Sequence, residues 1–95
     1  MKCERALFSG HAIQRMFRRG LGPDAVNAVI SGGEAIVDYP DDQPYPNRLL
    51  PGFVEGRPLH VVVAWVAGTG RCIIVTAYEP RPEQWAPGFR KRREQ

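Results

Sequence analysis

Residues 58–79 read PLHVVVAWVAGTGRCIIVTAYE and specify the centre of the fold. The first part, residues 58–66, is apolar on both faces, which is typical of a central β-strand. The turn Gly68-Thr69-Gly70 separates it from a second apolar run over residues 71–79, which predicts another strand. Because so short a turn requires antiparallel pairing, the two runs predict the middle of an antiparallel sheet.

Two further extended segments precede this pair in the chain. Residues 34–39 and residues 48–54 both read as strands. The prolines of residues 40–47 predict a stiff, irregular loop between them. Pro51 places the second of these strands at a sheet edge or a bulge, since proline cannot donate to the ladder.

The N-terminal third of the chain predicts two helices. Ser9 is a preferred N-cap and Gly20 a preferred stop, which predicts a helix over residues 10–19. Proline and aspartate at Gly22-Pro23-Asp24 suit the start of a second helix, which residues 31–33 end. The apolar stripe of the first helix is expected to contain Ala12, Ile13, Met16 and Phe17.

These segments predict one α+β domain over residues 1–95, with two N-terminal helices packed on one face of a four-stranded antiparallel sheet and a basic tail over residues 80–95. The other sheet face is left to bind a partner or to be covered by the tail. At 95 residues and 10.6 kDa the chain is too short for a two-domain enzyme or a doubly wound nucleotide-binding fold. Its longest apolar stretch is too short to span a bilayer.

The formal net charge of +3 is distributed unevenly. Residues 1–20 carry five basic side chains against one acid, and residues 81–95 carry five against two. Residues 21–80 carry three basic side chains against seven acids. If the two basic ends meet, they form one positive surface suited to a polyanion; otherwise they are two separate solvated patches.

The two cysteines, Cys3 and Cys72, do not make a disulfide scaffold. Cys72 lies in an apolar run and Cys3 near the terminus, so we expect two inert thiols. The N-terminus has no apolar signal-peptide core, and the expected location is a reducing cytoplasm.

His11 is the first candidate for acid–base chemistry. It lies in the first turn of the first helix, where the helix dipole favours a neutral imidazole that can act as a general base. Arg15 and Arg18 follow on the same side and can bind phosphate. The alternative is a solvated helix face that carries a histidine by chance. These side chains point away from the apolar stripe, so a cleft requires the tail or the loop at residues 40–47 to overhang them.

His60, near the start of the central strand, is the second candidate. It is either a second acid–base residue at the rim of the sheet or a core histidine satisfied by a backbone carbonyl. Tyr78 closes the last strand with a phenol available as a donor, or is simply an amphipathic strand-end residue. Arg48 follows the rigid loop and could reach the same rim.

No metal or cofactor is expected. The cysteines and histidines lack paired ligand spacing, and no glycine-rich phosphate loop opens a helix. Acid–base groups beside arginines suit RNA cleavage by the neighbouring 2′-hydroxyl, which needs no cofactor.

The chain resembles a bacterial family that is filed as a domain of unknown function, with the signature S-x-H-A-x-x-R-M-x-x-R. The corresponding residues here are Ser9 to Arg19. The segments VDYP (37–40), PYPNRL (44–49), GRPLHVVVA (56–64), IVTAYEP (74–80), EQW (83–85) and FRKR (89–92) follow in order. The resemblance therefore covers nearly the whole chain.

The resemblance implies a RelE-like toxin fold of the barnase, colicin and RelE group. It implies a type II toxin–antitoxin toxin that cleaves mRNA and is neutralised by an antitoxin protein, often of the YgiT zinc-finger type. The family's characteristic positions carry over to His11, Arg15, His60 and Tyr78 as catalytic residues. RNA phosphates are expected to be bound by Arg18, Arg48, Arg90, Lys91 and Arg92.

A metal-independent endoribonuclease is therefore expected, with its site residues converging on one positive cleft. The alternative is a binding module without catalysis, whose basic ends grip RNA or an acidic partner such as the antitoxin. A weaker alternative is a subunit whose exposed sheet face or edge strand pairs with a partner.

Overall fold

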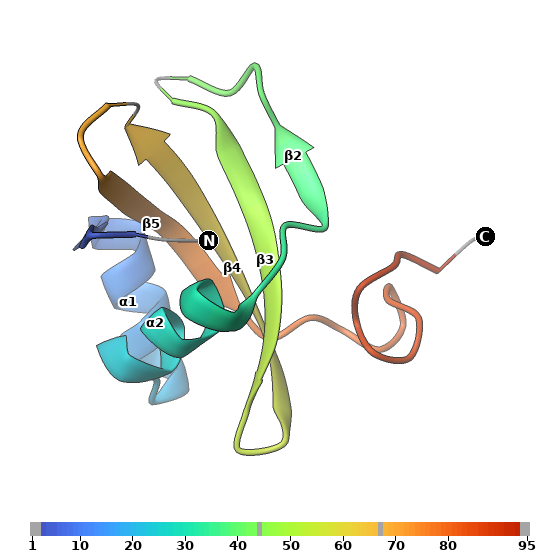
Figure 1. Ribbon diagram of the computed structural model, residues 1–95. Helices are drawn as coiled ribbons and strands as arrows, with labels where there is room; N and C mark the ends of the chain where they lie inside the picture. The colour runs from blue at the N-terminus through green and yellow to red at the C-terminus, as the bar shows by residue number, and fades with distance from the viewer. Residues whose placement is uncertain (1–2, 44, 67, 94–95) are drawn as a thin grey trace.

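The chain folds into a five-stranded mixed sheet with two helices on one face (Figure 1). The structure, a computed structural model, describes residues 3–43, 45–66 and 68–93; Pro44, part of the expected loop, lies outside these ranges. The elements in chain order are β1 (Arg5–Phe8), α1 (Gly10–Arg19), α2 (Pro23–Gly32), β2 (Val37–Tyr39), β3 (Asn47–Val54), β4 (Arg57–Val66) and β5 (Arg71–Tyr78).

The predicted α+β class is confirmed, but the predicted sheet is wrong in one respect. The strand order is β1-β5-β4-β3-β2, and β1 pairs in parallel with β5, with Ala6 opposite Cys72. The other neighbours are antiparallel, and β4 is central as predicted. Strand β1 was not predicted because it has four residues, and so short a segment with little alternation of polar and apolar side chains does not indicate a strand.

Helix α1 begins and ends where the sequence predicts. The Ser9 hydroxyl accepts a hydrogen bond from the Ala12 N–H at 3.0 Å and donates one to the Val75 carbonyl at 2.9 Å, which ties the helix start to β5. Gly20 ends the helix at φ 67°, a left-handed conformation that suits glycine. The helix therefore lies against β5 with a fixed start.

The predicted apolar stripe of α1 is only half buried. Ala12 and Met16 pack into the core, whereas Ile13 is 55% exposed and Phe17 87% exposed. The reason is geometric: α1 contacts the sheet along β5 only, so the side chains one position further round the helix have no element to cover them. On α2, Val26, Val29 and Ile30 are buried and Ala25 is half-buried.

The main core lies between the two helices and the sheet. It includes Leu50 of β3, Leu59, Val61 and Val63 of β4, and Ile74 of β5. Because side chains alternate along a strand, the residues between them face the other side of the sheet. On β4 that second set includes His60 and Ala64.

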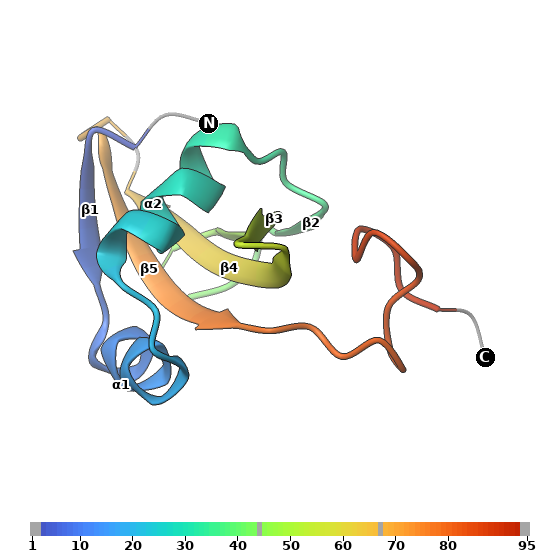
Figure 2. The ribbon, with the colours of Figure 1, turned by 90° about the horizontal axis from the view of Figure 1, so that it is seen from below.

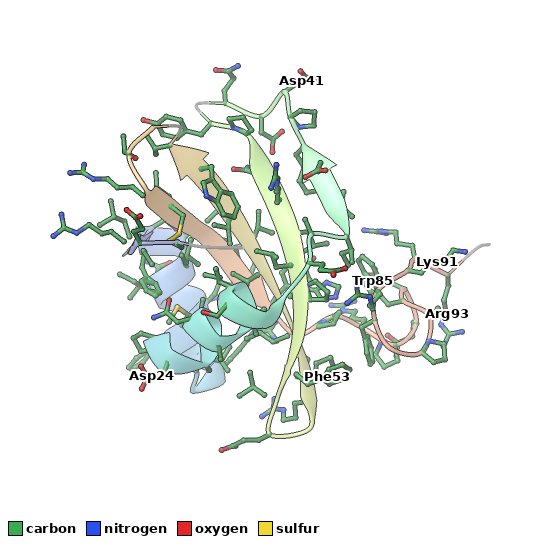
Figure 3. The ribbon with its side chains drawn as sticks, viewed as in Figure 1. Asp24, Asp41, Phe53, Trp85, Lys91 and Arg93 are labelled. Carbon is green, nitrogen blue, oxygen red and sulfur yellow. A yellow bond between two sulfur atoms is a disulfide. The ribbon has the colours of Figure 1, made fainter. Side chains whose placement is uncertain are left out.

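The C-terminal tail packs against one part of the second face of the sheet, around His60 and Phe53 (Figure 2). Trp85 is 4% exposed and packs edge-on against His60, with ring centroids 4.5 Å apart. Phe89 packs against Phe53 of β3, with centroids 6.3 Å apart. Figure 3 shows Trp85 on the side of the tail that faces the sheet and Lys91 and Arg93 on its far side. The tail is therefore docked on the sheet face that the sequence left open for a partner or for the tail.

Pro51 is accommodated at the outer side of β3. Strand β2 pairs only with residues Asn47 to Leu49, so beyond Leu49 no strand lies outside β3. The predicted edge position of this proline is confirmed for its own part of the strand. The expected strand over residues 34–39 is shorter than predicted, and β2 begins at Val37.

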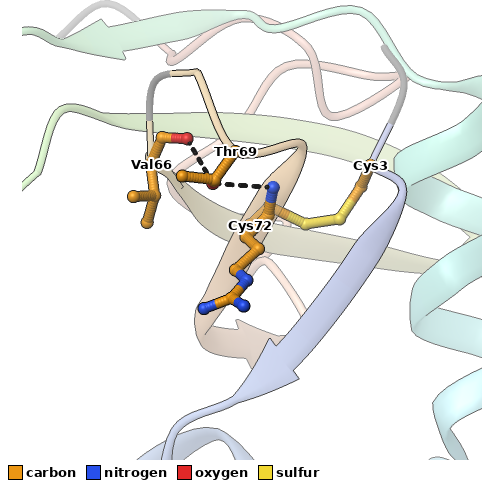
Figure 4. The surroundings of a disulfide bond; sticks show 5 residues. Cys3, Val66, Thr69 and Cys72 are labelled. Atoms are coloured by element: carbon orange, nitrogen blue, oxygen red, sulfur yellow. Dashed lines mark hydrogen bonds between the residues drawn. A yellow bond between two sulfur atoms is a disulfide. The ribbon is translucent and has the colours of Figure 1, made fainter.

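Cys3 and Cys72 form a disulfide, which corrects the expectation of two free thiols (Figure 4). The parallel pairing of β1 with β5 brings the segment before β1 beside Cys72, with Cα atoms 5.8 Å apart. In the adjoining turn the Thr69 hydroxyl donates to the Val66 carbonyl at 2.8 Å and accepts from the Arg71 N–H at 3.1 Å. The bond joins the N-terminal segment to β5, the neighbour of the edge strand β1.

Candidate functional site

A depression lies where β5 ends and the tail begins. Its volume is about 170 Å³. Arg15 and Arg19 of α1 line one side, and Tyr78 at the end of β5 lines another. The tail completes it with Pro80, Arg81 and Gln84, and Glu79 lies between. The arginines of α1 lie here because the start of the helix is hydrogen-bonded to β5 through Ser9.

Two further cavities adjoin this depression. One, about 560 Å³, is open and lies between Arg19, Pro58 and the tail; the other, about 240 Å³, lies between the helices and the β3–β4 hairpin. Arg19 and Glu79 line all three cavities. We call the three together the Arg19 groove.

The charges in the groove favour an anion. Arg15, Arg19 and Arg81 make no salt bridge in the part of the chain that the structure describes. Glu79 is held by Arg57, whose Nη2 and Nε lie 3.1 and 3.4 Å from its carboxylate oxygens. That hydrogen bonding holds the pKa of Glu79 below its usual value, so the carboxylate stays ionised and already has a cationic partner.

Tyr78 joins the depression to a buried polar cluster. Its hydroxyl lies 3.4 Å from Nδ1 of His60, and Nε2 of His60 lies 2.7 Å from the Phe89 carbonyl. Because a carbonyl can only accept, Nε2 carries the proton and Nδ1 accepts from the tyrosine hydroxyl. Burial raises the pKa of Tyr78, so its phenol remains protonated at neutral pH.

His60 is a buried residue, not a residue of the sheet rim. Its exposed fraction is 0%, and Trp85 of the tail covers its ring. Burial lowers the pKa of the imidazole, and the hydrogen bond to Phe89 opposes this only in part. The interpretation of His60 as a core histidine satisfied by a backbone carbonyl therefore describes its structure, and its ring cannot touch a bound substrate.

His11 lies outside the depression but close to its arginines in the helix. It is exposed and occupies the first turn of α1, one turn before Arg15 and on the same side. Arg19 continues this row by one more turn. His11, Arg15 and Arg19 are thus spaced four residues apart on one side of the helix. Arg18, which the sequence predicted as the next phosphate-binding residue, is exposed and lines none of the described cavities.

Arg48 does not reach the position expected for it. It pairs with Val63 across β3 and β4, so it shares the helix-covered face of the sheet, whereas His60 lies on the other face. Its guanidinium binds Asp38 of β2 at 3.0 Å and lies 5.4 Å from the Trp65 ring centroid. Of the residues expected to converge on one cleft, Arg15 and Tyr78 line the depression, whereas His11, His60 and Arg48 do not.

The basic residues at the end of the tail lie apart from the groove lining. Arg90 is 3.7 Å from Glu34, and Arg92 stacks over Trp85 at 5.3 Å. Lys91, Arg92 and Arg93 line a shallow depression with Ala86. Within the described ranges, the two basic ends of the chain come together in the depression that Arg15, Arg19 and Arg81 line.

Arg19 and Arg81 are the groove residues that sequence reasoning missed. Arg19 could have been found from its spacing to Arg15. Arg81 could not, because its contribution depends on how the tail leaves β5.

Two further searches bear on the class of site. Within the described ranges, no three histidine, cysteine, aspartate or glutamate side chains gather as metal ligands. None of the helices found there has the length and apolar character needed to cross a membrane.

Comparison with known proteins identifies the family of this chain. Neither a curated protein nor a solved structure matches the chain. One family model matches, over residues 8–79, and its description is a domain of unknown function, DUF4258. The match spans α1, α2 and strands β2 to β5, and includes His11, Arg15, Arg19, His60 and Tyr78. Because it covers well over half of the residues, this chain belongs to the DUF4258 family.

Proposed function

We propose that the Arg19 groove binds the phosphate backbone of RNA and that the protein cleaves it without a metal ion. The observation that carries the proposal is that three arginines, Arg15, Arg19 and Arg81, line one depression together with Tyr78. Arginine binds phosphate through charge-assisted hydrogen bonds. The same groups can stabilise the charge that grows on phosphorus oxygens during transfer.

The reaction proposed is attack by the neighbouring 2′-hydroxyl. His11 takes the proton of the 2′-oxygen, the 2′-oxygen bonds to phosphorus, and the bond from phosphorus to the 5′-oxygen breaks. The Tyr78 hydroxyl, which donates to Nδ1 of His60 in the free protein, turns to give its phenolic proton to the leaving 5′-oxygen. Tyr78 then recovers a proton from solvent, and His11 returns its proton to solvent. The products are a 2′,3′-cyclic phosphate and a free 5′-hydroxyl. His60 acts as a positioning residue, because its Nδ1 orients the Tyr78 hydroxyl.

A binding module without catalysis is the second candidate. It is favoured by the burial of His60, whose ring nitrogens are both engaged within the protein. In that case the groove holds RNA and no bond is broken. The two candidates share the same arginines and differ in whether Tyr78 and His11 transfer protons.

Cleavage of end-labelled RNA in the presence of EDTA separates the candidates. We expect cleavage by the wild type, a loss of about 100-fold or more in Tyr78→Phe with RNA binding retained, and a similar loss in Arg15→Ala with weakened binding. Arg71→Ala is the matched control, because Arg71 is an exposed arginine at the opposite end of β5. RNA binding without cleavage by the wild type would establish the binding module, and dependence on added metal would contradict the mechanism.

The biological role proposed is that of a type II toxin neutralised by an antitoxin protein, in the cytoplasm. Growth arrest on induced expression, relieved by Arg15→Ala, tests the toxin role. The disulfide bears on the location, because such bonds persist mainly in oxidising compartments. A cytoplasmic location therefore requires that Cys3 and Cys72 are reduced in cells, which thiol labelling of a rapid lysate measures.

A further inference from the structure

The largest enclosed part of the Arg19 groove plays no part in the reaction proposed above. This pocket of about 240 Å³ lies between the C-terminal end of α1, the first turn of α2 and the β3–β4 hairpin. Its apolar lining comes from Leu21, Ala25, Val54, Pro58 and Leu59, and charged side chains stand at its edge: Arg19, Glu55, Arg57 and Glu79. It is thus an apolar slot with a polar rim, the usual form of a site for a small planar group.

The pocket adjoins the phosphate-binding depression directly. Arg19 and Glu79 belong to the walls of both. A group joined to a phosphate in the depression can therefore enter the pocket without crossing protein. In RNA the groups next to each phosphate are a ribose and a nucleobase.

We propose that this pocket binds the nucleobase next to the phosphate held by Arg15, Arg19 and Arg81, and so sets the base preference of the protein. This inference rests on the proposed binding of RNA. At about 240 Å³ the pocket lies below the roughly 300–1,000 Å³ of sites for whole drug-sized ligands. It therefore suits a single base, with the sugar and phosphate left in the adjoining depression.

The rim determines which bases fit. Arg57 and Glu79 hold one another at 3.1 and 3.4 Å, so a donor and an acceptor stand side by side in fixed positions. The ionised carboxylate of Glu79 can only accept, and it suits a base with an exocyclic amino group: guanine, adenine or cytosine. Uracil has no amino group, and its single N–H lies between two carbonyl oxygens that repel the carboxylate. We therefore expect uracil to bind weakly.

Fluorescence anisotropy with short oligonucleotides tests the proposal. The probes are labelled 2′-O-methyluridine hexanucleotides in which one central residue carries guanine, adenine, cytosine, uracil or no base, and the 2′-O-methyl group removes the attacking hydroxyl. We expect at least one of the three probes with an amino-bearing base (guanine, adenine or cytosine) to bind about tenfold more tightly than the abasic and uracil probes.

Filling the pocket should abolish that difference. Ala25→Leu extends a half-buried side chain into the pocket, and the matched control Ala28→Leu makes the same change one turn later on α2, outside the pocket. In Ala25→Leu all probes should bind like the abasic probe, whose own affinity is unchanged and so reports an intact fold. Ala28→Leu should retain the tenfold preference.

The outcomes distinguish this inference from the proposed function. Equal binding of every probe by the wild type, or a preference that survives Ala25→Leu, overturns the nucleobase pocket while RNA binding stands. Failure of every probe to bind, the abasic one included, overturns the proposed RNA binding itself.

Discussion

Replacement of Trp85 by alanine should release the C-terminal tail from the sheet. The indole is 4% exposed, packs on the His60 ring at 4.5 Å and carries the Arg92 guanidinium on its outer side at 5.3 Å. Two backbone hydrogen bonds close the tail around it, from the Ala86 N–H to the Lys91 carbonyl at 2.8 Å and from the Arg93 N–H to the Gln84 carbonyl at 3.0 Å. Among residues 81–93 of the tail, no other side chain is buried.

The size of the effect follows from the buried area. A buried aromatic side chain covers roughly 150–250 Å², which at about 25 cal/mol per Å² is worth about 4–6 kcal/mol. That figure is an upper estimate, because an unfolded chain already buries some apolar surface. We expect the free energy of unfolding to fall by about 3 kcal/mol, a large part of the roughly 5–15 kcal/mol of a small domain. The corresponding fall in Tm is roughly 12–24 °C.

Urea unfolding gives the free energy, and brief trypsin digestion locates the change. In Trp85→Ala, cleavage within the basic run at residues 90–93 should become faster while the rest of the chain remains resistant. Phe17→Ala is the control, because Phe17 is 87% exposed and its loss should change the free energy of unfolding by no more than about 0.5 kcal/mol. A change below about 1 kcal/mol in Trp85→Ala, with an unaltered digestion pattern, would refute the docked tail.

Three other predictions concern stability. The folded state lowers the pKa of His60, so the wild type should lose stability as the pH falls below the unfolded value of about 6.5, and His60→Gln should lose less in urea titrations at about pH 7.5 and about pH 5. Closure of a 69-residue separation by the disulfide should contribute roughly 4 kcal/mol, seen as a lower urea midpoint in the Cys3→Ser/Cys72→Ser variant; equal midpoints would show that the bond does not constrain the unfolded chain. Gly20→Ala should cost about 1 kcal/mol because φ is 67°, whereas Gly22→Ala at φ −89° should cost less, and thermal melts that rank the two variants the other way would contradict the reasoning.

The helices and the central strands could be predicted from local signals. Ser9, Gly20 and Pro23 mark helix ends by chemistry that does not depend on the rest of the fold. In the apolar run at residues 58–66, Leu59, Val61 and Val63 pack in the core beneath the helices, and His60 on the other face is covered by the tail. Strand β1 escaped prediction because its partner, β5, lies more than sixty residues away, and no local pattern records a parallel pairing.

The candidate site depended on which face of an element each residue occupies. The helical spacing of Arg15 from His11 was sufficient to place both on one side of α1. Arg48 and His60 lie on opposite faces of the sheet, and side-chain alternation along the strands predicts this only when the register of β3 with β4 is known. The burial of His60 could not be predicted, because the tail that covers it is irregular and shows no helical or strand pattern in the sequence.

The tail also ties the stability of the fold to the composition of the groove. The family match ends at Glu79, yet the third guanidinium, that of Arg81, and the cover over His60 both come from residues beyond that point. Tyr78 connects the two, because the residue lines the depression and its hydroxyl bonds to His60. Release of the tail therefore removes one cation from the groove and exposes the imidazole that orients Tyr78, although Arg15 and Arg19 stay in place on α1. A variant such as Trp85→Ala should consequently weaken RNA binding while it destabilises the fold, whereas the disulfide variant, which acts at the opposite end of β5, should destabilise the fold and leave the affinity of the folded protein for RNA unchanged.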